Sequence, residues 1–265
     1  MIVGPFQATQ ATQATRKQIA DARKLAKSKG VGYLLSVDSD PKTAKSNAAN
    51  KGFYTAILYL APAKLSGYQV CASAKECVDP CLHTAGNPVY LKAKEKARIA
   101  RTRFYFEHRL EFFILLIAEI RAFIRKCDKL GMRPAIRLNG TSDIIWERVS
   151  PWLFDAFDTV TFYDYTKHTK RMAMAWELPG NYYLTFSRQK SNHDDALKIA
   201  RSGQNIAVVF RTKQLPRFWH GLPVINGDKT DLRFLDPFGS YIVGLSAKGR
   251  AKKDNSGFVV ENVEC

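Results

Sequence analysis

With 265 residues, 46% of them hydrophobic, the chain can form one α/β domain with a large core, and disorder is not expected outside the ends. Its 41 basic residues outnumber 24 acidic ones, and the net charge of +17 favours a polyanionic partner, nucleic acid or a nucleotide. Five cysteines, no signal peptide and no apolar run of membrane length exclude a secreted disulfide framework and a membrane partner, so a cytoplasmic setting fits best.

The first 32 residues predict a polar, basic helical arm that precedes a single domain over residues 33–265. A threefold Gln-Ala-Thr repeat runs into Arg16–Lys29, whose spacing permits a weakly amphipathic helix. Tyr33–Val37 is a short apolar run that suits an edge strand. The polar stretch Lys42–Asn50 is interpreted as a surface loop, with a lid as the alternative.

A cysteine cluster follows the first strongly predicted strand. Phe53–Leu60 is aromatic, branched and nearly uncharged, which indicates a strand buried on both faces. The residues of the cluster follow this strand in the sequence: Cys71, Cys77, Cys81 and His83. Three thiolates can ligate a 4Fe–4S cluster and leave one iron open, whereas the same residues with His83 could close a tetrahedral zinc site. Spacings of five and three residues are unlike common zinc motifs, so the cluster is preferred; thiols without metal are the remaining alternative.

Strands and helices alternate through the rest of the chain. Tyr90–Lys126 predicts one long helix or two joined helices, and its basic run Lys92–Arg103 is either a binding surface or a solvated face. Strands are expected at Ala135–Leu138, Thr159–Phe162, Tyr182–Phe186, Ile206–Phe210, Pro223–Ile225 and Tyr241–Ser246. Helices are expected at Ile145–Phe154, His168–Trp176 and Asn192–Ala200. Strands recurring about every 20–25 residues predict a (β/α) barrel-like fold, full or partial, with a doubly wound open sheet as the alternative.

Polar residues that follow barrel strands gather at the C-terminal face, where such folds bind their ligands. Asn139, Ser142, Asp143 and Tyr163 are therefore expected to contact a cofactor, although Asp143 could instead cap a helix. Asp143 and Lys167 are the candidate catalytic residues. Arg188 and Arg211, each placed just after a later strand, are expected to bind an anionic substrate.

Four segments follow one another along the chain: Leu60–Pro62, Cys71–Cys81, Arg137–Asp143 and Phe162–Lys167. In this order they resemble the phage proteins of the gene-product-88 type. The resemblance covers about Tyr33 to Gly257. It implies a phage protein located in the cytoplasm of an infected bacterial host.

A second resemblance is to radical S-adenosylmethionine enzymes, barrels whose three-cysteine loop follows the first strand. Cys71, Cys77 and Cys81 stand in the corresponding place, but the family's usual spacings are three and two residues. Asn139–Asp143 also replaces the family's Gly-Gly-Glu-like segment. The resemblance implies a 4Fe–4S enzyme that uses S-adenosylmethionine to modify a nucleotide or nucleic acid.

Two other functions stay open from the sequence. One is a non-catalytic, basic nucleic-acid-binding protein braced by a structural zinc or cluster. The other is a metal-dependent nuclease or nucleotide hydrolase that uses Asp143, Asp164 and Asp228.

Overall fold

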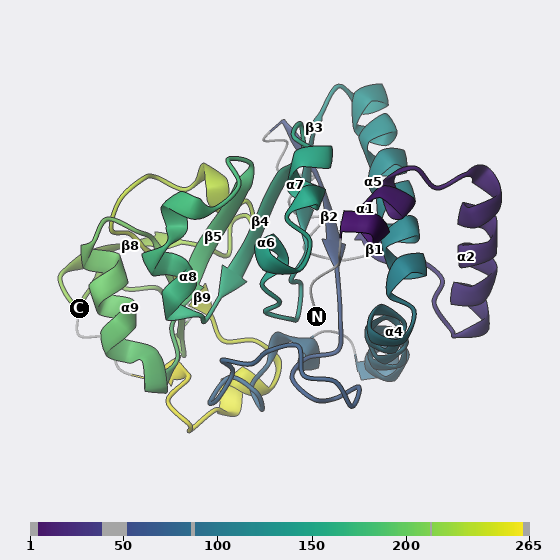
Figure 1. Ribbon diagram of the computed structural model, residues 1–265. Helices are drawn as coiled ribbons and strands as arrows, with labels where there is room; N and C mark the ends of the chain where they lie inside the picture. The colour runs from purple at the N-terminus through teal and green to yellow at the C-terminus, as the bar shows by residue number, and fades with distance from the viewer. Residues whose placement is uncertain (1–4, 39–51, 86–87, 213, 262–265) are drawn as a thin grey trace. The chain divides into compact units, whose positions relative to one another are not determined.

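The computed structural model describes residues 5–38, 52–85, 88–212 and 214–261 (Figure 1). The proposed lid Lys42–Asn50 lies outside them. The α-helices are α1 (Pro5–Thr12), α2 (Arg16–Ser28), α4 (Pro88–Glu107), α5 (Arg109–Leu130), α6 (Trp146–Val149), α7 (Trp152–Ala156), α8 (Thr169–Ala173) and α9 (His193–Arg201). The 3-10 helices are η1 (Leu82–Thr84), η2 (Ala175–Glu177), η3 (Lys190–Asn192), η4 (Arg233–Leu235) and η5 (Gly249–Lys253). Within this part of the chain, no helix combines the length and apolar character needed to cross a bilayer.

Among the residues that the structure describes, ten strands form one mostly parallel sheet, which confirms the expected α/β class. They are β1 (Leu35–Val37), β2 (Phe53–Leu58), β3 (Arg133–Arg137), β4 (Thr161–Thr166), β5 (Tyr182–Ser187), β6 (Ile206–Phe210), β7 (Phe218–Trp219), β8 (Leu222–Asn226), β9 (Ile242–Ser246) and β10 (Val259–Val260). The order is β1-β2-β3-β4-β5-β6-β9-β8-β7, with β10 paired to β6. The pairs β1–β2 and β7–β8 are antiparallel.

The strand order is open, so the structure does not show the barrel that the strand spacing suggested. Closing a barrel requires the first and last strands to pair along a useful length. Here the ends of the order are β1 and β7, which have three and two residues. Regular βα spacing predicts successive parallel strands, but it does not decide whether the ends of the sheet meet.

The chain divides into two compact units, which we describe separately. The first unit comprises residues 1–71, 92–162 and 179–182, and the second comprises residues 72–91, 163–178 and 183–265. The helical arm expected over residues 1–32 falls within the first unit.

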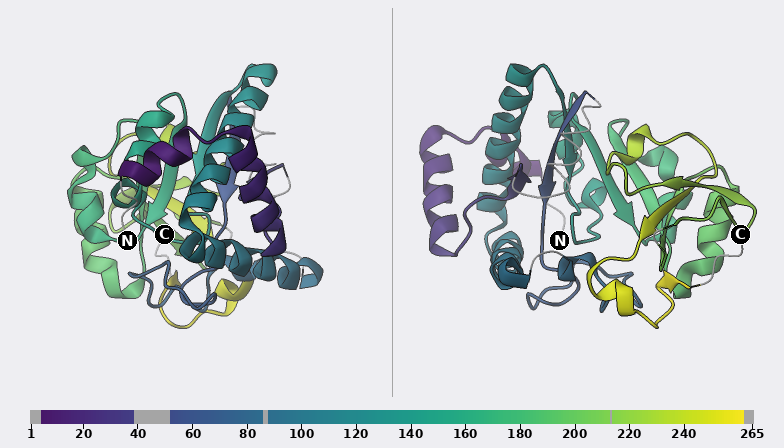
Figure 2. Two further views of the ribbon diagram at one scale, coloured as in Figure 1. Left: turned by 45° about the vertical axis from the view of Figure 1, so that its right-hand side comes forward. Right: turned by 180° about the vertical axis from the view of Figure 1, so that it is seen from behind.

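In the first unit, β2 is buried along its whole length, as its uncharged sequence predicts. Helix α5 packs its apolar face on β1 and β3, and α1 and α2 pack on α5. Figure 2 shows α5 lying between α2 and β2. In the second unit, α9 covers β6, and the core there includes Phe186, Phe210 and Ile242.

Two predicted helices are interrupted, for different local reasons. The segment Tyr90–Lys126 forms α4 and α5, which separate at His108, where the backbone leaves the helical region (φ −133°). The helix expected over Ile145–Phe154 becomes α6 and α7, because Pro151 has no N–H to donate to the preceding turn. Strands β7 and β10 have two residues each, too few to produce a recognisable pattern.

Glu119 on α5 fastens the N-terminal helices and β1 to the first unit. One carboxylate oxygen accepts a hydrogen bond from Arg23 Nη1 at 2.7 Å. The other accepts from the backbone N–H groups of Leu34 and Leu35, each at 2.9 Å. The Glu119 side chain is only 9% exposed, so these charge-assisted bonds act in a poorly solvated setting.

Glu119→Gln should lower the free energy of unfolding by about 1–3 kcal/mol, because a neutral amide cannot serve all three donors as a carboxylate does. Urea denaturation of the full chain measures this change. The matched control is Glu95→Gln on the exposed face of α4, which should be nearly neutral. Equal and small effects of the two substitutions would show that Glu119 does not hold the arm.

Candidate functional site

The loop Asn139–Asp143, expected to bind a cofactor, is braced from within by its own asparagine. Asn139 is 1% exposed, and its side-chain oxygen accepts from Ser142 Oγ (2.8 Å), the Ile144 N–H (3.0 Å) and Trp146 Nε1 (3.1 Å). Its amide nitrogen donates to the Ile144 carbonyl at 2.9 Å. These contacts hold the turn that leads into α6. The proposed contact of Asn139 and Ser142 with a cofactor stays a prediction.

Cys71 and Asp143 lie beside this loop in the first unit. The Cys71 thiol contacts the Thr141 carbonyl at 3.8 Å and accepts from the Ala63 N–H at 3.5 Å. The backbone N–H of Asp143 donates to the Val70 carbonyl at 2.8 Å, and the Asp143 side chain is half-buried. The structure therefore brings one predicted metal ligand next to the predicted cofactor loop.

Gly140 lets this loop lie directly against β2. A Cβ at position 140 would stand 2.6 Å from Ile57 Cγ2 and from Tyr59 Cδ1, and 2.8 Å from the Leu58 carbonyl oxygen. The Gly140 N–H donates to that same carbonyl at 3.0 Å. Close packing therefore accounts for the glycine in this motif.

The rest of the cysteine loop is fastened inside the second unit by side chains that follow β4 and β5. Gln189 holds two points of it: Nε2 donates to the Ser73 carbonyl at 2.9 Å, and Oε1 accepts from the Lys75 N–H at 3.2 Å. Ser73 Oγ lies 2.8 Å from His168 Nδ1. Gln189 is 2% exposed, so the loop is anchored to buried groups.

Cys77, Cys81 and His83 lie farther along this loop and are all partly exposed. They belong to the second unit, whereas Cys71 belongs to the first unit, as the last residue of its range 1–71. Within the described residues, no three histidine, cysteine, aspartate or glutamate side chains group as a metal site. The iron–sulfur cluster and the zinc alternative both stay predictions.

Lys167 and Tyr163 differ in their surroundings, although both were assigned to the site. Lys167 Nζ donates to Ser187 Oγ at 2.8 Å and lies 5.2 Å from the ring centre of Phe258. Tyr163 is 1% exposed, and its ring packs edge-on against Phe234 with centroids 5.3 Å apart. Lys167 thus links the end of β4 to β5, and Tyr163 lies in the core. Their catalytic and cofactor roles stay predictions.

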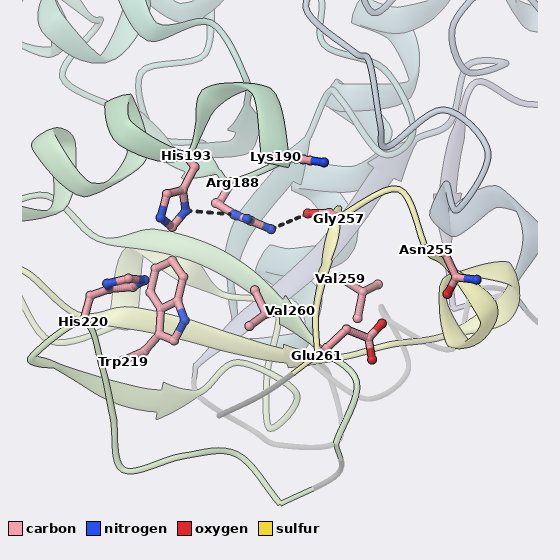
Figure 3. A pocket seen from close by; sticks show the side chains of 10 residues that line it. All are labelled: Arg188, Lys190, His193, Trp219, His220, Asn255, Gly257, Val259, Val260 and Glu261. Atoms are coloured by element: carbon pink, nitrogen blue, oxygen red, sulfur yellow. Dashed lines mark hydrogen bonds between the residues drawn. The ribbon is translucent and has the colours of Figure 1, made fainter. Parts of the chain in front are cut away.

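Arg188 holds residues 254–261, which we call the C-terminal segment. Its Nη1 donates to the carbonyls of Gly257 (2.6 Å) and Phe258 (3.3 Å), and its Nε donates to His193 Nδ1 (3.3 Å; Figure 3). Arg188 is 9% exposed, and burial lowers the pKa of its guanidinium, an effect that the charge of Glu76 opposes. The predicted substrate-binding residue is therefore a buried cation that touches mainly dipoles.

Arg211 holds the same segment from β6. It donates to the backbone carbonyls of Ala251, Lys252 and Asp254, and its Nε lies 3.0 Å from a carboxylate oxygen of Glu261. The hydrogen bond from Arg211 lowers the pKa of Glu261. Arg211 thus neutralises the carboxylate of the segment, and a direct contact between Arg211 and substrate stays a prediction.

A pocket of about 370 Å³ opens beside the C-terminal segment in the second unit (Figure 3). Four of its side chains are cationic or imidazole groups: Arg188, Lys190, His193 and His220. The other lining residues are Trp219, Asn255, Gly257, Val259, Val260 and Glu261. Because Arg211 binds Glu261, the pocket has an excess of positive charge.

Sequence reasoning identified Arg188 but missed the other basic side chains of this pocket. His220 and Gly221 form the two-residue turn between β7 and β8, with φ values of 48° and 77°. Left-handed backbone at both positions is typical of a tight hairpin turn, where Asn-Gly is the preferred pair. One feature of the sequence could have revealed His220. The step Trp219-His220-Gly221 lies between two apolar runs, and this pattern indicates a turn with an imidazole at its tip.

His193 is held as a neutral imidazole by its neighbours. Burial lowers its pKa below the ordinary value, the charges of Arg188 and His220 lower it further, and Asp194 opposes the shift. Because Nδ1 accepts from Arg188 Nε, the proton of the neutral ring sits on Nε2. The ring centroids of His193 and His220 are 5.2 Å apart. The pocket therefore contains an N–H donor of fixed tautomer beside a buried cation.

The basic run Lys92–Arg103 is partly used inside the first unit. Arg101 Nε donates to the Tyr33 carbonyl at 2.6 Å, and Arg103 Nε donates to the Ser66 carbonyl at 3.2 Å. These arginines join α4 to the chain on either side of β2. They are bound as parts of the fold, which reduces the basic surface that α4 offers to a partner.

The carboxylates of the nuclease alternative lie in different surroundings. Asp143 belongs to the first unit, and Asp164 and Asp228 belong to the second. Asp164 is fully buried in β4. Asp228 accepts from Lys248 Nζ at 2.5 Å and from the Ser246 N–H at 2.9 Å. These contacts of Asp228 hold together the loops that contain Asp228 and Lys248.

Gly140→Ala should lower the free energy of unfolding by about 1–3 kcal/mol, because the added methyl group overpacks a contact with β2. The midpoint of urea unfolding measures the effect. Gly180→Ala is the control, since a Cβ at position 180 meets nothing within 4 Å. A Gly140 variant as stable as the control would contradict the packing account.

Comparison with known proteins supports the first resemblance and not the second. Residues 33–262 match the model of a family described as gene product 88. That range includes the cysteine loop, Asn139–Asp143 and every residue of the pocket, and it begins after α2. No curated protein and no solved structure matches the chain significantly, and nothing supports the resemblance to radical S-adenosylmethionine enzymes. The match covers most of the sequence, and the chain belongs to the gene product 88 family of phage proteins.

Proposed function

We propose that the second unit binds a phosphate-bearing ligand, a nucleotide or the end of a nucleic acid, in the pocket beside the C-terminal segment. The observation that carries the proposal is the excess of cationic and imidazole groups among the side chains that line this pocket. The cytoplasm of an infected bacterial host, expected for a phage protein, supplies such ligands. The proposal corresponds to the binding alternative of the sequence analysis rather than to an assigned reaction.

The size and charge of the pocket both suit this ligand class. Small-molecule pockets usually enclose roughly 300–1,000 Å³, and a cavity of about 370 Å³ is sufficient for a mononucleotide. Lys190 is exposed and can turn its ammonium group toward a phosphate. Nε2–H of His193 can donate to an anionic oxygen without a change of protonation.

The buried positive charge of Arg188 favours an anionic ligand in the pocket. A buried guanidinium is poorly solvated, and here its hydrogen-bond acceptors are two carbonyls and a neutral imidazole. A phosphate nearby would supply negative charge where water cannot fully solvate the cation. His220 is exposed and lines the pocket, so its ring is available to contact a nucleobase.

Lys190→Gln should weaken binding of a 5′-mononucleotide about tenfold, since a charge-assisted hydrogen bond contributes roughly 1.5–3 kcal/mol.

His220→Asn should weaken binding of the same mononucleotide severalfold while keeping the turn, because Asn-Gly suits the left-handed backbone there. Isothermal titration calorimetry on the full chain measures both affinities.

Lys170→Gln, on the exposed face of α8 in the same unit, removes an equal charge away from the pocket and serves as the control. Its affinity should stay within about twofold of the parent protein, as expected for a screened surface charge. Unchanged affinity in both pocket variants, or an equal loss in the control, would refute the proposed site.

A second candidate function is a radical S-adenosylmethionine-type enzyme with a 4Fe–4S cluster on Cys71, Cys77 and Cys81. The observation in its favour is that the loop follows a fully buried parallel strand and is anchored at Ser73 and Lys75 by Gln189. A cluster would supply one-electron chemistry at this loop. Asp143 and Lys167 would then be the residues to place a substrate, as the sequence suggests.

Anaerobic reconstitution with iron and sulfide should load about four irons per chain and give visible cluster absorbance. Cys77→Ala and Cys81→Ala should abolish both signals. Cys127→Ala should keep them, because Cys127 is fully buried on α5 and desolvation raises the pKa of its thiol to about 12. Zinc without iron would support the structural-zinc alternative instead, and a protein that retains neither metal would exclude both.

A further inference from the structure

Helix α2 presents a face of basic side chains that has no role in the fold. Arg16, Lys17, Lys24 and Lys27 are all exposed. At 3.6 residues per turn these four positions fall within an arc of about 100° on the helix surface. The opposite face contains Ala22 and Ala26, which are buried against α5. The cations therefore point away from the packed side of the helix.

These four side chains form no ion pair and no hydrogen bond with any described residue. The one acidic residue of α2, Asp21, is exposed on the same side but forms no ion pair there. Arg23 differs from the four, since it turns toward α5 and binds Glu119 at 2.7 Å. The fold thus uses one cation of this helix and leaves four to the solvent.

The arrangement is electrostatically unfavourable for an isolated helix. Arg16 and Lys17 stand in the first turn, which contains no acidic residue, and cations at a helix N-terminus oppose the helix dipole. Lys24 and Lys27, three residues apart, repel each other. Asp21, four residues after Lys17 and three before Lys24, and the position of Lys27 in the last turn offset this repulsion in part. A bound polyanion would compensate the rest.

We propose that this face of α2 binds the phosphate backbone of nucleic acid. Arg16 and Lys27 are about 16 Å apart along the axis, a length over which duplex DNA presents several phosphates. The proposal is independent of the pocket, because α2 and the pocket belong to different units. The face also lies outside residues 33–262, the range that the family model matches.

One further observation favours nucleic acid over an anionic membrane, and a second suits any extended polyanion. A helix that lies on a membrane inserts an apolar face, and the apolar side of α2 is already buried on α5. The positive charge is also concentrated in the first unit, whose sequence contains 24 basic and 12 acidic residues, against 17 and 12 in the second. This distribution suits a long anionic partner.

The test is the salt dependence of binding to a short DNA duplex, measured by fluorescence anisotropy with the full chain. A variant with Arg16, Lys17, Lys24 and Lys27 all changed to Gln should bind more weakly. Its slope of log K against log salt should fall by about 3 to 4, since each phosphate contact contributes about 0.9. Mononucleotide binding should be unchanged, which separates this proposal from the pocket.

The control variant changes Lys198, Arg201, Lys252 and Lys253 to Gln, which removes the same charge from exposed positions of the second unit. Its slope should change by less than about 1. Equal slopes for the two variants, or no binding of duplex by the parent protein, would overturn the proposal. The proposal would also be overturned if the α2 variant lost binding to phosphatidylserine vesicles while its affinity for the DNA duplex stayed the same as that of the parent protein.

Discussion

The second unit depends on two arginines that bind backbone carbonyls. Arg188 and Arg211 together hold the C-terminal segment against the ends of β5 and β6. Carbonyl dipoles stabilise a guanidinium without cancelling its charge, unlike a carboxylate partner. Arg211 also pairs with the carboxylate of Glu261, so the uncancelled charge is that of Arg188, which lines the pocket. The carbonyl contacts of Arg188 therefore leave this part of the pocket positive. In this unit, the same interaction gives both the shape of the site and its preference for an anion.

Several acidic side chains in this protein bind basic groups or backbone N–H groups of the fold, whereas many basic ones face the solvent. Glu119 fastens the arm in the first unit, and in the second unit Asp228 and Glu261 each bind a basic side chain. With so few acidic residues, using them as internal clasps leaves the surface basic. A basic surface attracts polyanions over a Debye length and strengthens any specific contact at low salt. The charge excess in the sequence thus favours binding of a polyanion.

The sequence predicted the local strands and helices well, but it did not predict that the sheet stays open instead of closing into a barrel. The buried strand at Phe53 and the regular βα rhythm follow from hydrophobic pattern, which depends on neighbours in the chain. Whether a sheet closes depends on contacts between its ends, which no local pattern records. The sequence drew attention to the Asn139–Asp143 loop, but composition could not show that the Asn139 side chain forms hydrogen bonds within its own turn. The pocket was largely missed because its wall joins a two-residue strand, a hairpin turn and the C-terminal segment, all far apart in sequence.

The most direct test of the account is an NMR titration of the histidine side chains in the full chain with a 5′-mononucleotide. The protein has five histidines, and two of them line the pocket. The account predicts that the imidazole signals of His193 and His220 shift on binding. It also predicts that the pKa of His193 rises, because a bound phosphate opposes the burial and the positive charges that lower it. Shifts confined to His83, His108 or His168, or no shifts at saturating nucleotide, would contradict it.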